Sequence, residues 1–585
     1  MTKSFFFTAV VLMACSCVKK RDLSENTAII HLPANPNGLH ITNDISFYRA
    51  WIFDYTQQTL VKFDVKTKQM VPVLATGLPE ADSSGLHYVY TLRDDARWDD
   101  GSSISTDDVV FSSKLVVCPA TNNPQVKGVF TSVIKKVEKD TADPQKIHLY
   151  THTKNRSNAE IFVEIFIMQK KLRDPKGITD EISFEDCFDP SFKLSERQQQ
   201  WFDDFNKEEN RKDINWLSGC GPYKITEWKD DSYLVLEKKK NWWGDNNPEL
   251  QLLNEPDKII FRIIKDETAV YFAIRNETID ATNRLGLTKL MQLQQHDYFN
   301  DAYQSEFSDS YGYNYIGMNM KPDGFSHKPV FTDKKVRKAI AHLVPADDFI
   351  RVFYKGKAQR QVSYVSPMKD EYNSSLPPVP FDPEKAKRLL DEAGWKDTDG
   401  DRIRDKVING EKIKFSFQLM YFTDAPPSKE MALMMKEEFY KAGLDMNLYA
   451  AEFGLFYEKA FSHDFDMLMG AWQGSAAYED PTQLWHTSQW ANFGANFCGF
   501  GDAQSDSLIA SVNEELNDSL YLVKVHELQK RVYDEQPYVF LFSPKSRVAI
   551  HRRFDTEIYN ERPQMAVNAF RLLPSYSGKN NLPAQ

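Results

Sequence analysis

The segment from Asp397 to Asp405 contains residue types that could hold a metal ion. Aspartates stand at positions 397, 399, 401 and 405, around Gly400. Alternating carboxylates around a glycine are typical of calcium-binding loops, because Ca²⁺ prefers oxygen ligands. The glycine comes one position early for an EF-hand, and Ile408 stands where a glutamate would close such a loop. The calcium candidates are therefore Asp397, Asp399, Asp401 and Asp405, and an acidic surface turn is the alternative.

The sequence offers few catalytic motifs. It contains neither G-x-S-x-G nor H-E-x-x-H, and His526-Glu527 lacks the second histidine of a zinc protease motif. The 12 histidines are spread singly, and among 83 acidic residues no carboxylate pair can be assigned from sequence. We therefore expect a binding protein and not an enzyme. A secreted hydrolase, such as a glycosidase, is the alternative, and it would need a pair of titratable groups in a cleft.

The cysteines do not form a metal-binding pattern. Beyond the N-terminus they are Cys118, Cys187, Cys220 and Cys498, which lie far apart and include no C-x-x-C. This spacing argues against a zinc site. An exported protein could form a disulfide, but the sequence assigns no pair, and we expect buried free thiols.

The N-terminus predicts export. A positively charged start is followed by an apolar stretch from Phe5 to Ala14, which is shorter than the about 20 residues of a membrane-spanning helix. The stretch ends in Leu-Met-Ala before Cys15, similar to a bacterial lipoprotein signal, with Cys17 as the second candidate for acylation. We expect residues 1–21 to be signal peptide and linker, and lipid alone to hold the protein to a bacterial membrane, at the periplasmic face or elsewhere in the cell envelope. An ordinary cleaved signal is the alternative.

Length and charge limit the remaining classes. The chain has 585 residues, which is too long for one hydrophobic core, and its net charge is −11. Basic runs such as Lys239-Lys240 are local and do not form a basic face. We therefore expect several domains and no nucleic-acid partner.

The first half of the chain predicts strands joined by turns. Residues 28–32, 133–134 and 147–150 have the pattern of strands. Between residues 90 and 112, a strand meets a turn at Gly101 and then a helix capped by Ser105 or Thr106. Asp107 and Asp108 in the first turn favour that helix through its dipole. Every polar residue of this stretch thus has a structural role, and we interpret the stretch as scaffold.

After residue 300 strands and helices alternate. The predicted strands are residues 313–320, 413–420, 467–469 and 538–542, and the predicted helices are residues 334–342, 382–394, 428–442 and 524–534. This alternation indicates an α/β lobe.

Several longer motifs occur in order along the chain. They are Pro72–Ala75, Leu92-Arg93 with Asp100-Gly101, Gly219–Tyr223, Trp242–Gly244, Val336–Ile340 and Asp382–Trp395. In this order they resemble the extracellular solute-binding proteins of family 5, the oligopeptide- and dipeptide-binding proteins of peptide ABC transporters. The resemblance covers essentially the whole mature chain.

The resemblance implies a fold and a domain layout. The fold is α/β, a two-lobed periplasmic binding protein-like fold (type II, cluster C) with an extra inserted domain. Domain I is discontinuous, and its expected segments are residues 22–65, 218–290 and 500–585. Domain II is the insertion at residues 66–217, and domain III is the C-terminal lobe at residues 291–499. A cleft between two lobes, joined by hinge strands, would hold the ligand.

The resemblance also implies where a ligand would bind. In the family an aspartate three residues after a tryptophan meets the α-amino group of a peptide, and an arginine three residues before it can meet the carboxyl end. Relative to Trp472, these positions hold Ser475 and Met469, so both charged anchors are absent. A less charged ligand, such as a blocked or modified peptide or an oligosaccharide, gains support, although Glu479 or Asp480 could turn toward the ligand.

The expected ligand-binding residues come from both lobes. Aromatic side chains with a few polar groups are typical of small-molecule sites, and core packing is the alternative for each aromatic. The candidates are Trp472, Gln473, Gly474, Ser475, Phe453 and Tyr478, with Leu32 and Asn35 from a loop of domain I.

The resemblance implies a substrate-binding lipoprotein of an ABC importer, without a cofactor. It would capture a peptide or peptide-like solute by hinge closure and deliver it to a membrane permease, as a monomer. The alternatives are the hydrolase above, a lipoprotein that binds an oligosaccharide, and a sensor or chaperone.

Overall fold

A computed structural model describes residues 21–576, apart from residues 45, 123, 246, 424, 426, 492 and 493. The predicted signal peptide, with Cys15 and Cys17, lies outside the described residues. Among the described helices, none combines the length and the apolar character that crossing a bilayer requires.

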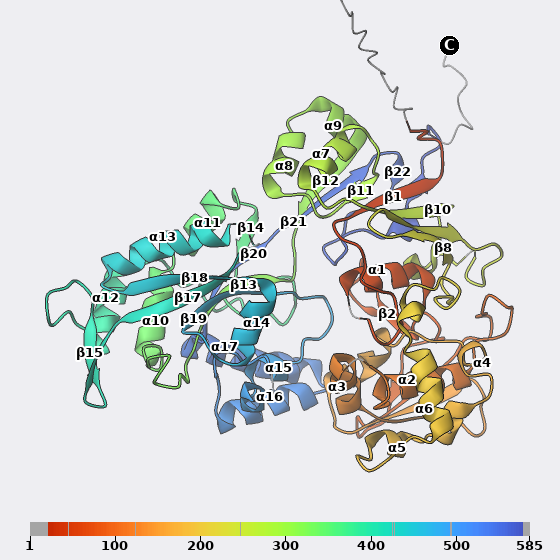
Figure 1. Cartoon of the computed structure of the whole chain (residues 1–585), viewed down its shortest axis with the longest axis horizontal. Coiled ribbons are helices and arrows are strands. Elements are labelled where there is room, and N and C mark those ends of the chain that lie inside the picture. The colour runs from red at the N-terminus through yellow and green to blue at the C-terminus, as the bar shows by residue number, and fades with distance from the viewer. Residues whose placement is uncertain are drawn as a thin grey trace, which may run out of the picture.

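Two large sheets form the centres of two lobes, and a smaller sheet forms the centre of an insertion (Figure 1). Lobe I and the insertion lie on the right of Figure 1, and lobe II lies on the left. We use these names below: lobe I contains the first sheet, lobe II the second sheet, and the insertion the four-stranded sheet.

The first sheet has seven strands in the order β12-β21-β11-β1-β10-β9-β8. The strands are β1 (Thr27–Leu32), β8 (Tyr223–Lys229), β9 (Tyr233–Lys238), β10 (Lys258–Ile263), β11 (Ala281–Thr282), β12 (Tyr303–Ser308) and β21 (Ser546–His551). Alternate residues of β1 face opposite sides: Ile30 packs toward the large core beneath α1 (Phe47–Thr56), and Ile29 packs toward the opposite side. Helices α7 (Glu267–Arg275), α8 (Leu287–Leu293) and α9 (Asp297–Ala302) cover that opposite side.

The insertion has the sheet order β4-β5-β7-β6. Its strands are β4 (Glu80–Ala81), β5 (His87–Thr91), β6 (Ile134–Lys139) and β7 (Lys146–Thr151), and its helices include α2 (Thr106–Val117), α3 (Pro124–Val133), α4 (Lys170–Arg173), α5 (Phe184–Phe188) and α6 (Glu196–Phe205). The strand and capped helix predicted between residues 90 and 112 are confirmed as β5 and α2, which begins after Ser105. The Asp108 carboxylate accepts hydrogen bonds from the Ser105 backbone N–H at 2.8 Å and from Trp98 Nε1 at 3.2 Å, so its role is structural.

One strand prediction in the insertion is partly wrong. Val133 ends helix α3, and strand β6 begins only at Ile134. A valine followed by an isoleucine has high strand propensity, but such local propensity is weak against the packing of a neighbouring helix.

The second sheet has six strands in the order β14-β20-β13-β19-β17-β18. The strands are β13 (Tyr313–Met318), β14 (Ala358–Arg360), β17 (Ser416–Phe422), β18 (Asp445–Ala451), β19 (Met467–Trp472) and β20 (Tyr538–Pro544). Ile316 and Met318 of β13 face one buried core, and Tyr313 and Tyr315 face another. Both faces of this sheet are therefore covered, as in other α/β folds.

Helices cover the second sheet on both faces. The longer ones are α10 (Lys334–Leu343), α12 (Pro383–Glu392), α13 (Ser428–Lys441), α14 (Phe453–Phe461), α16 (Ala503–Glu514) and α17 (Asp518–Glu535), with the shorter α11 (Ala346–Val352) and α15 (Thr482–Trp485). Small two-stranded sheets pair β2 (Val61–Phe63) with β3 (Met70–Pro72), β15 (Asp405–Ile408) with β16 (Glu411–Lys414), and β22 (Phe554–Asp555) with β23 (Arg571–Leu572).

The chain crosses between the lobes twice, at positions that differ from the expected boundaries. Strand β12 still pairs within the first sheet and β13 within the second, so the first crossing is at residues 309–312 and not at 290. Strand β20 pairs with β13, and β21 returns to the first sheet, so the second crossing is at residue 545 and not at 500. Changes of sequence pattern do not locate these crossings, because each crossing is a short segment that joins a strand of one sheet to a strand of the other.

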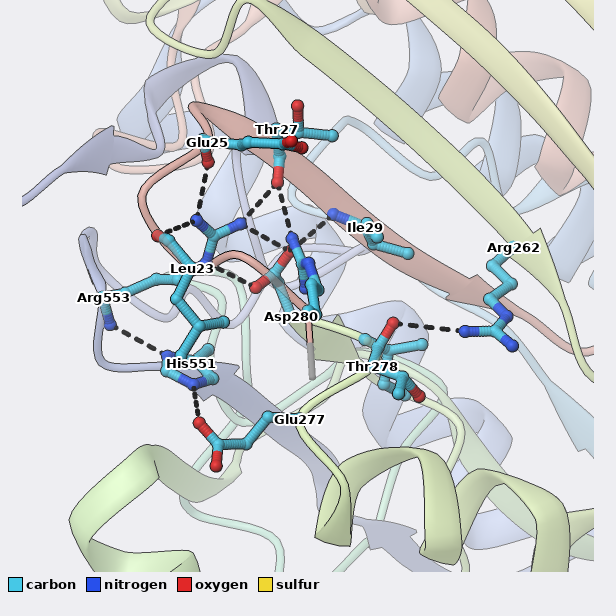
Figure 2. Close-up of polar contacts among 12 residues, drawn as sticks. Leu23, Glu25, Thr27, Ile29, Arg262, Glu277, Thr278, Asp280, His551 and Arg553 are labelled. Atoms are coloured by element: carbon cyan, nitrogen blue, oxygen red, sulfur yellow. Dashed lines mark hydrogen bonds and ion pairs between the residues drawn. The ribbon is translucent and has the colours of Figure 1, made fainter. Parts of the chain in front are cut away.

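A buried charge network on lobe I joins the segment before β1 to the segment after β21. Arg553 and Asp280 are both fully buried, and Arg553 Nε lies 2.7 Å from Asp280 Oδ1 (Figure 2). Arg553 Nη1 also donates to the carbonyl oxygens of Leu23 and Glu25, each at 2.8 Å. Burial alone would raise the pKa of Asp280, but the hydrogen bonds and charges of Arg553 and Arg21 outweigh it and hold this pKa below its usual value. The carboxylate therefore stays ionised and joins the N-terminal and C-terminal segments.

Candidate binding cleft between the lobes

A cavity of about 160 Å³ lies where the two lobes meet at their crossing strands. Ser310 and Lys545 of the crossings line it, together with residues of both sheets. Side chains brace the crossings against each other: Ser310 Oγ donates to the Pro544 carbonyl at 2.6 Å, and Lys545 Nζ pairs with Asp309 Oδ1 at 2.6 Å. The cavity is therefore located where a change in lobe angle would open or close it.

Lobe I contributes three arginines to this cavity. Arg284 follows β11, Arg547 lies on β21, and Arg562 lies in the C-terminal segment, and all three line the cavity. Arg284 and Arg547 are partners in an isolated β-bridge, and the pKa of Arg547 is lowered by desolvation and by repulsion from Arg284, so the two side chains lie close together. The three arginines therefore form one basic wall of the cavity.

The aromatic ring of Phe47, at the start of α1, supports that wall. The guanidinium carbon of Arg562 lies 4.3 Å from the centroid of the Phe47 ring, and that of Arg284 lies 5.1 Å from it. Arg284 is exposed to the cavity, yet the protein that encloses the cavity lowers its pKa by desolvation. Desolvation also lowers the pKa of Arg547 and Arg562, and repulsion from Arg284 lowers both further.

Lobe II contributes a wall of backbone and uncharged side chains. Asn314, Trp472 and Gln473 line the cavity from this side, and Gln473 Oε1 accepts a hydrogen bond from Arg562 Nη1 at 2.9 Å across it. The backbone comes so close at Gly474 that an added Cβ would lie 2.9 Å from the Tyr311 carbonyl oxygen. A glycine at this position therefore lets two loops meet at the floor of the cavity.

Trp472 belongs to an aromatic stack as well as to the cavity. Its ring is nearly parallel to that of Tyr315, with centroids 6.2 Å apart, and to that of Phe497, with centroids 5.8 Å apart. The indole N–H donates to the Tyr538 hydroxyl at 3.4 Å. The stack holds the indole in a fixed position, and the half-buried ring presents part of its surface to the cavity.

The structure brings three of the sequence candidates into the cavity: Trp472, Gln473 and Gly474. Ser475 follows directly, but its hydroxyl accepts from the Ala477 backbone at 3.3 Å. Tyr478 lies further along the loop, where its hydroxyl donates to Asn513 Oδ1 at 2.6 Å. These last two residues therefore shape the loop and do not line the cavity.

The other three candidates lie elsewhere. Leu32 is fully buried in the first sheet, where β1 pairs with Ile263 of β10. Asn35 donates to Asp230 Oδ1 at 3.1 Å within lobe I. Phe453 is 70% exposed and stacks on Phe422 with centroids 5.9 Å apart, away from the cavity lining.

Neither acidic residue of the 475–481 loop turns into the cavity. Glu479 Oε1 pairs with Lys369 Nζ at 3.3 Å and accepts from the Ser475 backbone at 3.4 Å. Asp480 Oδ2 accepts from Asn155 Nδ2 of the insertion at 3.0 Å. Among the described residues that line the cavity, there is no aspartate or glutamate, while four are lysine or arginine.

A second set of contacts closes the insertion against lobe II. Arg156 Nη1 donates to the Glu515 carbonyl at 3.1 Å, and its guanidinium carbon lies 4.3 Å from the Tyr521 ring centroid. Helix α16 contacts the short 3-10 helix Arg156–Val163 of the insertion here. Burial raises the pKa of Glu160 to about 7, although the backbone N–H of Tyr478 and the charge of Lys369 oppose the rise. The two sides of the cleft are thus in contact in this structure.

In the predicted calcium loop, the carboxylates pair with a lysine of the neighbouring strand β16 and with backbone N–H groups. Oxygens of Asp397, Asp399 and Asp405 lie within 4.8 Å of one another, and Asp401 is outside this group. Lys412 Nζ pairs with Asp399 at 2.9 Å and with Asp405 at 3.3 Å. Asp397 accepts backbone N–H groups of the loop itself, for example that of Gly400 at 2.7 Å.

The four cysteines of the described part, Cys118, Cys187, Cys220 and Cys498, are all buried. The Cys187 thiol forms a hydrogen bond with Cys118. This bond is the largest of the causes that raise the pKa of Cys187.

Sequence reasoning missed most of the lobe I wall. Besides the three arginines, Asn283, Asn560 and Gln564 line the cavity from this lobe. The sequence does contain one sign of this wall: polar and basic residues directly follow buried strands. Examples are Asn283-Arg284 after β11 and Lys545 with Arg547 after β20. Strand ends of open α/β sheets are common ligand sites, but the sequence does not show that these ends lie together.

Comparisons with known proteins agree with this architecture. The family model for bacterial extracellular solute-binding proteins, family 5 (middle region), matches residues 69–495. The oligopeptide-binding protein AppA of Bacillus subtilis is 25% identical over 574 residues, which covers 95% of this chain and 94% of AppA. The heme-binding protein A of Haemophilus influenzae is 22% identical over 569 residues, covering 91% of this chain and 92% of the relative.

Solved structures show the same fold. NikA from Brucella suis, in complex with Fe(III)-EDTA, superposes with a TM-score of 0.73 at 19% identity, covering 94% of this chain and 100% of NikA. AppA from Bacillus subtilis, in complex with a nonapeptide, superposes with a TM-score of 0.70 at 21% identity, covering 94% of this chain and 99% of AppA. The mixed α/β periplasmic binding protein fold expected from the sequence is confirmed.

Proposed function

Because the chain belongs to the bacterial extracellular solute-binding proteins of family 5, whose members bind and do not catalyse, we propose that it captures a short peptide or a peptide-like solute for an ABC importer. The solute lies between the lobes, the lobes close on it, and a membrane permease recognises the closed form. Lipid at Cys15, or at Cys17, holds the protein to the membrane at the cell envelope.

One observation carries this proposal: the cavity at the crossing strands takes its lining from both lobes. A ligand in such a place contacts both walls only when the lobes are closed, so it shifts the population toward the closed form by its differential affinity. Trp472 and Gln473 of lobe II and Arg562 of lobe I are the contacts that would be completed on closure.

The size of the cavity favours a small solute. Its volume of about 160 Å³ is below the roughly 300–1,000 Å³ of pockets that enclose drug-sized ligands. The names of the relatives support a range of solutes, since they include an oligopeptide-binding protein and a heme-binding protein. A peptide remains the first expectation because AppA aligns along almost the whole chain.

Closure and binding can be tested together. The protein is unfolded and refolded to remove any bound solute, and small-angle scattering and thermal melting are recorded with and without short peptides. We expect the radius of gyration to fall and the melting temperature to rise with at least one peptide, with the peptide recovered intact. If no short peptide produces either change, the assignment to peptides is wrong. If no peptide, metal chelate or heme does so, solute binding itself is wrong.

A further inference from the structure

The cavity arginines, Arg284, Arg547 and Arg562, have no carboxylate partner. Among the described residues, no aspartate or glutamate lies within 4.0 Å ion-pair distance of any of the three guanidinium groups. The acidic groups whose charge acts on Arg547 and Arg562 also bind backbone groups: Glu267 Oε1 accepts from the Gly286 backbone at 2.7 Å, and Glu561 Oε2 accepts from the Ala476 backbone at 2.7 Å.

The hydrogen-bonding capacity of these arginines is also largely unused within the chain. Arg547 Nε donates to the Leu285 carbonyl at 2.7 Å, and Arg562 Nη1 donates to Gln473 Oε1 at 2.9 Å. Each guanidinium carries five N–H donors, so most donors of the three arginines have no hydrogen-bond acceptor among the described residues. The remaining cation of the lining, Lys545, is neutralised by Asp309 at 2.6 Å.

Holding three such charges together is costly for the ligand-free protein. Arg284 repels both Arg547 and Arg562, and all three are partly desolvated. Uncompensated charges in such surroundings are kept in proteins chiefly where they serve a ligand. The planar fork of arginine matches the two oxygens of a carboxylate or phosphate group.

We propose that the solute is an anion, and that Arg284, Arg547 and Arg562 hold its carboxylate or phosphate group against lobe I while Trp472 and Gln473 cover it from lobe II. This inference rests on the proposed solute-binding function and names the chemical class of the solute. It also reverses the expectation of a less charged ligand: the charge anchor is present, but it comes from lobe I and not from the loop after Trp472.

The orientation of a bound solute follows from this arrangement. Its anionic group would lie next to the crossing strands, and the cavity lining contains no carboxylate that could pair with an α-amino group at the same place. A short peptide would therefore enter with its carboxyl end first, and a small polyanion would need no amino group at all.

Isothermal titration of the refolded protein tests the proposal with two matched pairs of probes. The first pair is trialanine and trialanine amide, which differ in a peptide carboxylate. The second pair is citrate and trimethyl citrate, which differ in the charge of a small polyanion. We expect the carboxylate-bearing probe of one or both pairs to bind at least about tenfold more tightly than its amide or ester, since hydrogen bonds to charged groups contribute the most. The pair that shows the difference identifies the source of the anionic group.

Variants assign the effect to the cavity arginines. Arg284→Gln and Arg547→Gln should each weaken binding of the anion by about tenfold or more. Arg262→Gln is the matched control, because Arg262 lies exposed on β10 of the same sheet, outside the cavity lining. We expect this control to bind like the wild type.

Three results would overturn the proposal. They are equal binding of each carboxylate probe and its amide or ester, unchanged binding of the carboxylate probe by both cavity variants, and absence of binding by trialanine and citrate at millimolar concentration. Scattering separates these failures from failure of the proposed function: if trialanine amide or trimethyl citrate closes the lobes, the solute-binding function stands and only the anionic class is wrong.

Discussion

The two ends of one strand pair in lobe I, β11 with β21, carry arginines in opposite electrostatic situations. At one end Arg553 is fully buried against Asp280, which also pairs with Arg21 at 2.7 Å. At the other end Arg284 and Arg547 are bridge partners that face a cavity without any acidic lining residue. Arg553 has a carboxylate partner within the chain. Arg284 and Arg547 have none in the cavity lining, so a solute would have to supply the negative charge. Partnership, more than burial, therefore distinguishes structural arginines from those that bind a solute.

The largest effect should come from breaking the satisfied pair. Asp280→Asn leaves Arg553 buried without a negative partner, so we expect the free energy of unfolding to fall by about 3–5 kcal/mol. Urea denaturation followed by circular dichroism measures this loss. A loss below about 1 kcal/mol would show that Arg553 is not a structural arginine in the sense used here.

The wall opposite the cavity arginines should contribute the next largest effect. Trp472→Ala removes the ring that covers the solute from lobe II, so we expect binding of the preferred solute to weaken by more than about 1 kcal/mol. Titration calorimetry on the variant gives this value, with Phe453→Ala as the control outside the cavity. Unchanged affinity would remove Trp472 from the site and leave its ring with a role in the aromatic stack alone.

In the ligand-free protein, replacing a cavity arginine should not lower the free energy of unfolding, in contrast to Asp280→Asn. Arg284→Gln relieves repulsion from Arg547 and Arg562, so the free energy of unfolding should stay the same or rise by about 0.5 kcal/mol. The same urea experiment, on protein freed of solute by refolding, measures it. A clear loss of stability would contradict the contrast between the two ends of the strand pair.

A carboxylate at the contact between the insertion and lobe II provides a third electrostatic case. Burial raises the pKa of Glu160 from 4.5 to about 7, so its contribution to stability is complete below about pH 4.5 and is lost as the pH rises through about 7. Glu160→Gln imitates the protonated form. We expect the variant to melt about 2 °C above the wild type at about pH 8 and at the same temperature at about pH 5.

The outcome for Glu160 has a clear contrary result. If the difference between variant and wild type is the same at both pH values, the carboxylate does not titrate in this range. Glu160 would then stay ionised in the folded protein, as Asp280 does.

The smallest effect is expected at the acidic loop. Lys412 and Lys414 already pair with Asp399, Asp405 and Asp401, so millimolar calcium should change the melting temperature by less than about 1 °C. A larger rise that chelator reverses would show that the loop binds calcium after all.

Local signals predicted much of the scaffold. The capped start of α2 after Ser105 and the buried strand at Ala28 to Leu32 depend on neighbouring residues, so their patterns are visible in the sequence. The motifs around Gly219–Tyr223 and Asp382–Trp395 supported the family and its two-lobed fold. Leu32, by contrast, was expected to face the cleft but is fully buried, because the last residue of β1 still packs into the core of lobe I.

The cavity could be predicted only in part. Trp472, Gln473 and Gly474 form one continuous segment, and resemblance located all three. Arg284 and Arg547 lie in separate segments that the strand order β12-β21-β11 brings together, and Arg562 comes from the C-terminal segment beyond β22. Sequence spacing contains no trace of that order, so their common charge was not visible before the fold was known.

The most direct test of the account is to identify the molecule that the protein carries in its own cell. The protein is purified from its native host without denaturation, the solute is released by unfolding, and mass spectrometry determines its identity and charge. We expect one class of small molecule with a carboxylate or phosphate group, present in wild-type protein and depleted in Arg284→Gln. A neutral or cationic molecule, carried equally by both proteins, would contradict it.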